Sequence, residues 1–121
     1  MKILIVEDEP LIAMHIEQMV KDFGYHVCGM AASAHEAIRL AAFECPHIAL
    51  MDIHLAGGSS GIDAAQALFE RHGVSCIFLS ANVGDAHLRQ AVQLFNPIAF
   101  LGKPVLPVVL QRALERAANS I

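Results

Sequence analysis

The stretch ILIVEDEP, at residues 3–10, decides how this chain should fold. Its first four residues are apolar and three of them are β-branched, which is typical of a strand that is buried on both faces of a parallel sheet. An acidic run then ends the strand. From Pro10 to Phe23 the apolar residues recur three and four positions apart, so the pattern predicts a helix that begins near Pro10 and stops at Gly24.

The same strand-then-helix alternation continues to the end of the chain. Further strands are expected at 25–30, 48–51, 75–79 and 98–101, and further helices at 34–43, 61–71, 85–94 and 105–118. Five such units with short connections predict a three-layer α/β/α sandwich around a five-stranded parallel sheet with right-handed crossovers. In sheets of this kind, ligands bind outside the carboxyl ends of the strands.

The length and composition favour one compact domain over residues 1–121. The chain is 55% apolar and 17% charged, which supplies ample material for a core and gives no sign of disorder. The apolar excess also leaves room for an exposed apolar patch, of the kind that marks a partner surface. The initial Met and the five complete units favour a whole protein, although a domain of a hybrid kinase remains open.

Charge and cysteine usage exclude several classes of protein. Eight basic and twelve acidic residues give a formal charge of −4 without a basic cluster, which argues against direct nucleic-acid binding. No apolar run approaches the length of a membrane span, and the first acidic residues come too early for a signal peptide. Three scattered cysteines are expected to be reduced thiols. We therefore expect a cytoplasmic protein that does not bind membranes.

Polar residues that follow the predicted strands should meet at one edge of the sheet. They are Glu7 and Asp8 after the first strand, Asp52 after the third, Ser80 after the fourth and Lys103 after the fifth. Each one alone is an ordinary loop position. Clustered carboxylates, however, repel one another unless a cation holds them, and hard oxygen ligands suit Mg²⁺. The set therefore predicts a site for Mg²⁺ (or Mn²⁺).

The chain resembles the receiver domains of bacterial two-component response regulators over essentially its whole length. Several motifs carry this resemblance together, and none of them is specific alone. They are ILIVEDEP (3–10), LMDIHL (50–55), GID (61–63), LSA (79–81) and FLGKP (100–104). The resemblance implies a flavodoxin-like fold with the parallel strands in the order 2-1-3-4-5.

The resemblance also implies that Asp52 is a phosphoacceptor. Asp52 would take a phosphoryl group from a phosphohistidine and become a 4-aspartylphosphate. Glu7, Asp8 and Asp52, together with the backbone carbonyl of His54, would hold the Mg²⁺. Such a protein catalyses its own phosphorylation and a slow autodephosphorylation, and it is not a turnover enzyme.

Lys103, Ser80 and Phe100 would respond to the phosphoryl group. Phosphoryl transfer spreads charge over peripheral oxygens, so the Lys103 ammonium and the Ser80 hydroxyl would stabilise them. Phe100 stands at the family's aromatic position, whose movement from exposed to buried reports phosphorylation to the surface of the last two helices and the fifth strand. The Lys103–Pro104 bond is typically cis in the family. Taken alone, Phe100 would be a core aromatic and Ser80 a turn-capping hydroxyl.

Several features of the sequence depart from the commoner family pattern or leave a choice open. The loop 55–61 is one residue longer and has Ala56 where Pro is common, so we expect it to be more mobile. Asn96-Pro97 replaces a Gly-Ala pair, which should change only the local backbone because Asn tolerates the left-handed region. Glu7 replaces an Asp, and metal binding should survive. His54 and Asn82 either govern the access of water to the phosphoryl group or have no special role.

The expected partners and the competing functions follow from this resemblance. Upstream it implies a sensor histidine kinase or a histidine phosphotransferase. Downstream it implies a protein partner or a homodimer through the last two helices and the fifth strand. One alternative is a receiver-like scaffold or dimerisation module that works without phosphorylation. Another is a flavodoxin-like enzyme or nucleotide binder, but the first strand is not followed by the GxGxxG or GxxxxGK[ST] loop that cradles phosphates.

Overall fold

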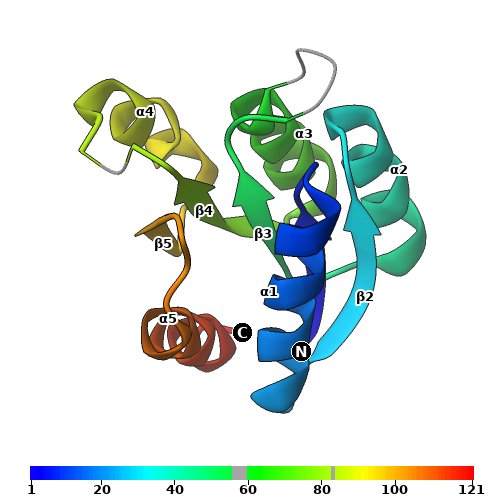
Figure 1. Ribbon diagram of the computed structural model, residues 1–121. Helices are drawn as coiled ribbons and strands as arrows, with labels where there is room; N and C mark the ends of the chain where they lie inside the picture. Colours follow the sequence, from blue (N-terminus) through cyan, green and yellow to red (C-terminus); the bar gives the residue numbers. More distant parts are fainter. Residues whose placement is uncertain (56–59, 83) are drawn as a thin grey trace.

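The computed structural model describes residues 1–55, 60–82 and 84–121, and strands alternate with helices along them (Figure 1). The loop at 56–59, for which greater mobility was expected, lies outside the described residues. In chain order the elements are β1 (Lys2–Val6), α1 (Pro10–Asp22), β2 (His26–Ala31), α2 (Ala34–Glu44), β3 (Ile48–Asp52), α3 (Gly61–His72), β4 (Ser75–Ser80), α4 (Ala86–Ala91), a 3₁₀ helix η2 (Gln93–Phe95), β5 (Ala99–Gly102) and α5 (Pro107–Asn119).

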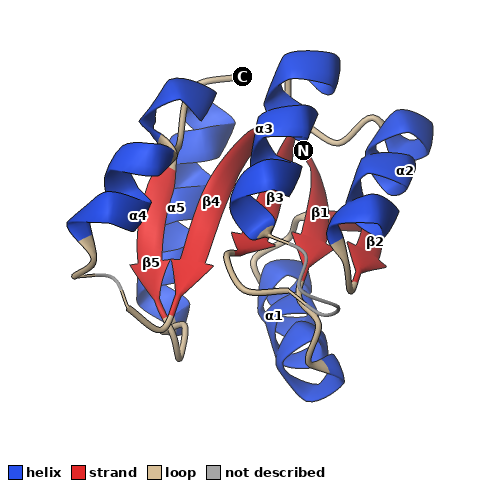
Figure 2. Cartoon of the chain, turned by 90° about the horizontal axis from the view of Figure 1, so that it is seen from above, coloured by secondary structure: helices blue, strands red, loops and turns tan. Residues whose placement is uncertain are grey.

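The strands form one parallel sheet in the order β2-β1-β3-β4-β5, which confirms the expected topology. Helices α1 and α5 cover one face, and α2, α3 and α4 cover the other (Figure 1). All the arrowheads point the same way, and both chain ends lie at the opposite end of the sheet (Figure 2). The molecule is the three-layer sandwich that the alternation predicts.

The central strands are buried on both faces because their side chains alternate between two cores. On β1, Ile3 and Ile5 pack with α1 and α5, whereas Leu4 and Val6 pack with α2 and α3. All four are 0% exposed. Each side chain buried in this way stabilises the fold by roughly 1.5–3 kcal/mol. The uninterrupted apolar run in the sequence therefore reflects two cores that share one sheet.

The start of α3 is pressed against the end of β3. Ser60 caps the helix, and its Oγ accepts hydrogen bonds from the backbone N–H groups of Ile62 (3.1 Å) and Asp63 (3.4 Å). The next residue, Gly61, donates its N–H to the carbonyl oxygen of Ile53 (2.8 Å). A Cβ at this glycine would lie 1.9 Å from the carbonyl oxygen of Asp52, and this distance is too short for any residue with a side chain. The glycine is therefore required for the close approach that supports Asp52.

Two helices near the C-terminus have boundaries that differ from those expected. The helix expected at 85–94 begins at Ala86, ends at Ala91 and is followed by η2, where the N–H of Phe95 donates to the carbonyl oxygen of Val92 at 3.0 Å, three residues back. The last helix begins at Pro107, which suits the first helical turn, and not at Val105. Asn96 adopts the left-handed conformation at φ 53°, as its residue type allows, and Lys103–Pro104 is cis as the resemblance implied.

Candidate functional site

The five polar residues expected at the sheet edge are brought together by the strand order. Glu7 and Asp8 follow β1, Asp52 ends β3, Ser80 ends β4 and Lys103 follows β5. Since β1, β3 and β4 are neighbours in the sheet, Asp52 lies between the acidic pair and Ser80. The carboxyl ends of parallel strands meet at one edge, which is why residues far apart in the chain converge here.

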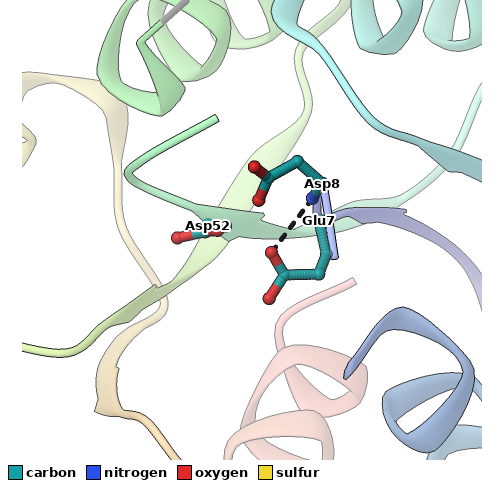
Figure 3. A group of neighbouring side chains, drawn as sticks. All are labelled: Glu7, Asp8 and Asp52. Carbon is teal, nitrogen blue, oxygen red and sulfur yellow. Dashed lines mark hydrogen bonds between the residues drawn. The ribbon is translucent and has the colours of Figure 1, made fainter. Parts of the chain in front are cut away.

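Glu7, Asp8 and Asp52 form an acidic cluster. Each offers one carboxylate oxygen, and these oxygens lie within 4.8 Å of one another. In Figure 3 the side chains of Glu7 and Asp8 leave the backbone in opposite directions beside Asp52. Glu7 and Asp52 are each only 3% exposed, and Asp8 is half-buried. Three hard oxygen donors in this arrangement can hold a divalent cation such as Mg²⁺.

Two of these carboxylates share the ammonium of Lys103. Its Nζ lies 2.7 Å from Oε1 of Glu7 and 3.2 Å from Oδ2 of Asp52. Burial, together with the neighbouring Asp52 carboxylate, raises the pKa of Glu7 to about 7, although Lys103 opposes this. Burial acts to lower the pKa of Lys103, but the hydrogen bonds to Glu7 and Asp52 outweigh it and the pKa is raised. The site therefore holds more negative charge than Lys103 neutralises, as expected for a cation site.

Backbone N–H groups orient the carboxylates. The N–H of Asp8 donates to Oε2 of Glu7 at 3.0 Å, the bond that Figure 3 shows as a dashed line. The N–H of His54 donates to Oδ1 of Asp52 at 3.2 Å, so the two Asp52 oxygens face an amide and an ammonium respectively. These contacts hold Asp52 in one orientation. The expected ligation by the His54 carbonyl stays a prediction.

Ser80 is completely buried beside this cluster. Its Oγ accepts the N–H of Asn82 at 3.0 Å, and its carbonyl oxygen accepts the N–H of Lys103 at 2.9 Å. A hydroxyl that accepts one hydrogen bond still carries a proton to donate. Ser80 can therefore donate to an oxygen bound at Asp52 while it remains attached to the loop after β4.

Asp52 is reached through a cavity of about 270 Å³. Its lining residues are Asp8, Glu9, Ile12, Asp52, His54, Ala81 and Lys103. A larger cavity of about 370 Å³ adjoins it at Ile12 and Lys103, but its other lining residues lie on α1 and in the segment before α5, and none is a carboxylate. We place the chemistry in the smaller cavity because Asp8 and Asp52 of the acidic cluster line it.

Phe100 on β5 lies beside two residues that sequence reasoning did not single out. It is half-buried, and its ring centroid is 6.2 Å from that of Phe78, with 29° between the ring planes. The Cζ atom of Arg89 on α4 lies 5.3 Å from the Phe100 centroid. Phe78 is the cross-strand partner of Phe100 in the pairing of β4 with β5, and directly paired residues share a sheet face. No pattern in the sequence predicts that the Arg89 side chain lies over the Phe100 ring.

The chain is similar in sequence to known signalling proteins. Residues 3–115 match the family described as the response regulator receiver domain. The chain belongs to this family. It is 46% identical over 81 residues to the phyllosphere-induced regulator PhyR of Methylorubrum extorquens, a match that covers 66% of the chain and 30% of PhyR. It is 30% identical over 118 residues to the transcriptional regulatory protein PdtaR of Mycobacterium tuberculosis, which covers 98% of the chain and 57% of PdtaR.

Solved receiver structures agree with this assignment. The signal receiver domain of a modulated diguanylate cyclase from Desulfovibrio desulfuricans superposes with a TM-score of 0.88 at 34% identity, covering 98% of the chain and 94% of that structure. The response regulator PhyR from Brucella abortus superposes with a TM-score of 0.80 at 36% identity, covering 96% of the chain and 46% of PhyR. The flavodoxin-like fold implied by the resemblance is confirmed.

Membership of the receiver family sets the general role. The chain spans between 30% and 57% of the length of the two curated relatives named above. Receiver domains of this family occur in signalling regulators such as PhyR and PdtaR, and the family implies interaction with kinases or phosphotransfer partners. Among the described residues, no helix is long and apolar enough to cross a membrane.

Proposed function

We propose that this receiver domain is a phosphorylation-dependent switch in which Asp52 accepts a phosphoryl group from a phosphohistidine. The observation that carries the proposal is the position of Asp52. It lies 3.2 Å from the Lys103 ammonium, within an acidic cluster that opens into a cavity. An ordinary carboxylate at the end of a strand would have neither the Lys103 ammonium nor the carboxylates of Glu7 and Asp8 beside it.

The transfer makes one bond and breaks one. An Asp52 oxygen attacks phosphorus, the bond between phosphorus and the donor's imidazole nitrogen breaks, and the imidazole keeps the electron pair. Lys103 is close enough to Asp52 to neutralise an oxygen of the arriving phosphoryl group, and Ser80 donates its hydroxyl proton to another. Mg²⁺, held by Glu7, Asp8 and Asp52, would supply further charge neutralisation when bound.

We propose that residues 1–121 act as one receiver unit whose output is a protein contact. Upstream, a histidine kinase or a histidine phosphotransferase would supply the phosphoryl group. Downstream, a partner or a second copy would bind the α4–β5–α5 face, and the chain between α4 and α5 exposes large apolar side chains in η2, before α5 and on α5. Leu94 is 84% exposed, Leu106 is 59% exposed and Val108 is 55% exposed.

A small phosphodonor tests the chemistry directly. Incubation with acetyl phosphate and Mg²⁺ should add one phosphoryl group, detected by intact-protein mass spectrometry. Asp52→Asn should gain none, whereas Asp22→Asn, at an exposed position at the end of α1, should gain as much as the wild type. No gain in the wild type, or an equal gain in Asp52→Asn, contradicts the proposal.

A scaffold that works without phosphorylation is a second candidate, supported by apolar exposure on α1. Leu11 is 81% exposed and Met14 is 58% exposed on this helix. Such a module would self-associate or bind its partner equally well with and without a phosphodonor. Sedimentation of wild type and Asp52→Asn in both conditions separates the two functions, since only the switch changes its association on phosphorylation.

A further inference from the structure

Helix α4 is weakly held against the sheet. It has six residues, none of them buried, whereas every other α-helix in the described part of the chain contributes buried residues. Leu88 is only partly buried against the core. Figure 1 shows α4 beside β4 and β5, at the end of the sheet away from β2. A short helix with little buried surface can move at low cost in free energy.

Arg89 connects this helix to the sheet through Phe100. Its guanidinium carbon lies 5.3 Å from the Phe100 ring centroid, inside the range of about 6 Å over which a cation is attracted to an aromatic face. Phe100 in turn lies against Phe78, which is 0% exposed and belongs to the core between the sheet and helices α2 to α4. The ring therefore has a fixed neighbour in the core and a charged neighbour on a weakly held helix.

A continuous series of hydrogen bonds joins Ser80 to the same helix. Oγ of Ser80 accepts from the N–H of Asn82 at 3.0 Å, and the carbonyl oxygen of Asn82 accepts from the N–H of Asp85 at 3.2 Å. The carbonyl oxygen of Asp85 then accepts from the N–H of Arg89 at 3.2 Å. Asp85 also caps α4, since its Oδ1 accepts from the N–H groups of His87 and Leu88. The first turn of α4 is thus attached to the buried hydroxyl.

We propose that Arg89 is a positioning residue for Phe100, and that it passes movement of the loop after β4 to the ring. The coupling rests on the proposed function, because a phosphoryl group on Asp52 is what would draw Ser80 inward. Asn82 and Asp85 follow Ser80, α4 shifts with them, and the guanidinium changes its position over the ring. At rest, the Arg89–Phe100 contact ties α4 to the sheet.

The resting contact is tested without any phosphodonor. We expect Arg89→Gln to shift the Phe100 ring signals in spectra of ¹³C-phenylalanine protein and to speed amide exchange in α4 several-fold. Arg89→Lys keeps a cation and should stay close to the wild type. Arg39→Gln removes an exposed charge from α2, on the far side of α3, and should match the wild type. If Arg89→Gln behaves like Arg39→Gln, the proposal is overturned.

A double-mutant cycle separates a direct contact from a general loosening of the helix. Phe100→Leu removes the ring, so it should speed α4 exchange as Arg89→Gln does, and the double variant should add little more. It also assigns the Phe100 signals, because they are lost in this variant. Additive effects of the two substitutions would show that Arg89 acts on α4 without Phe100 and would overturn the proposal.

Phosphorylation tests the coupling. With acetyl phosphate and Mg²⁺, the wild type, Arg89→Lys and Arg89→Gln should gain the same mass, but the change in the Phe100 signals should be much smaller in Arg89→Gln. An undiminished change in Arg89→Gln overturns the coupling. If the wild type gains no phosphoryl group, the proposed function fails, whereas the resting comparison and the double-mutant cycle still decide whether Arg89 positions Phe100.

Discussion

Two carboxylates and one ammonium define the chemistry at the scale of single residues. Glu7 and Asp52 are buried, and Lys103 lies within 3.2 Å of both. One positive charge cannot neutralise two buried anions, so Glu7 binds a proton more readily than an exposed carboxylate does. A bound divalent cation would replace that proton. The protonation of Glu7 and the occupancy of the metal site are therefore linked.

The linkage makes the stability of the metal-free protein depend on pH. The pKa of Glu7 is raised from 4.5 to about 7 in the folded state, so its stabilising contribution is complete below pH 4.5 and is lost as the pH rises through about 7. In EDTA, urea unfolding from pH 5 to 8 should show a steeper loss of stability for wild type than for Glu7→Gln. Glu115→Gln, at an exposed position on α5, should keep the wild-type slope. Equal slopes for wild type and Glu7→Gln would contradict the linkage.

Loss of the Lys103 ammonium should cost far more than loss of a surface ion pair. Lys103→Met leaves two buried carboxylates unpaired, and breaking a buried pair in this way costs about 3–5 kcal/mol. Lys21→Met breaks the partly exposed pair between Lys21 and Glu17 (3.2 Å) on one helix, and surface pairs with this spacing contribute about 0.3–0.5 kcal/mol. Urea unfolding at pH 8 in EDTA compares them. Similar losses in both variants would show that the carboxylates do not depend on Lys103.

At the scale of elements, the site depends on how closely α3 approaches β3. The helix begins one residue after its Ser60 cap, and Gly61 touches the backbone at the end of β3. This contact fixes the backbone that carries Asp52. Helix α4 differs from α3 because it has no buried residues, so it can move when the loop after β4 moves. A rigid helix beside the acceptor and a weakly held helix beside Phe100 suit a switch.

Gly61→Ala should destabilise the protein and weaken the site together. The added Cβ would lie 1.9 Å from the Asp52 carbonyl oxygen, so α3 or β3 must move. Forced overpacking of this kind costs about 1–3 kcal/mol. Gly84→Ala is the matched control because a Cβ there has no described atom within 4 Å, and it should change stability by less than about 0.5 kcal/mol. Thermal unfolding and the acetyl phosphate assay measure both effects, and a neutral Gly61→Ala would contradict this account of the contact.

At the scale of the whole molecule, the central strands of the sheet are buried in apolar cores, and their carboxyl ends carry the charged groups of the site. Two apolar cores hold β1, β3 and β4 in place, so the carboxylates cannot separate to relieve their repulsion. A cation that binds only the folded state therefore stabilises the entire fold. This property distinguishes a working metal site from an acidic cluster without a ligand.

Mg²⁺ should raise the melting temperature, and by more at pH 8 than at pH 6. The pH dependence of this shift follows from Glu7. Because its pKa is about 7, Glu7 carries a proton at pH 6 that Mg²⁺ must displace, whereas at pH 8 it is already ionised. At a concentration one hundred times its Kd, a ligand adds about 2.7 kcal/mol. Asp8→Asn should lose most of the shift, and Asp22→Asn should keep it. Calorimetry with Mg²⁺ and with EDTA measures this, and no shift in the wild type would favour the scaffold function.

Most of the fold and the residues of the site could be predicted from the sequence. Buried parallel strands have continuous apolar runs, and amphipathic helices have three-and-four spacing, so the alternation was visible. Parallel strands end at one edge, so Glu7, Asp8, Asp52, Ser80 and Lys103 could be grouped before any distance was known. The early end of α4 was missed because the apolar spacing of three and four residues is the same for an α-helix and for the 3₁₀ turn that follows Ala91.

The sequence by itself determined the order of elements and the types of groups at the sheet edge, because both depend on local patterns and on strand direction. Only the tertiary structure decided which groups touch. It placed Lys103 against Glu7 as well as Asp52, showed that Gly61 is needed beside Asp52, and aimed Arg89 at Phe100. Such contacts depend on how far apart packed elements lie and how they are rotated, and many side chains together set that geometry.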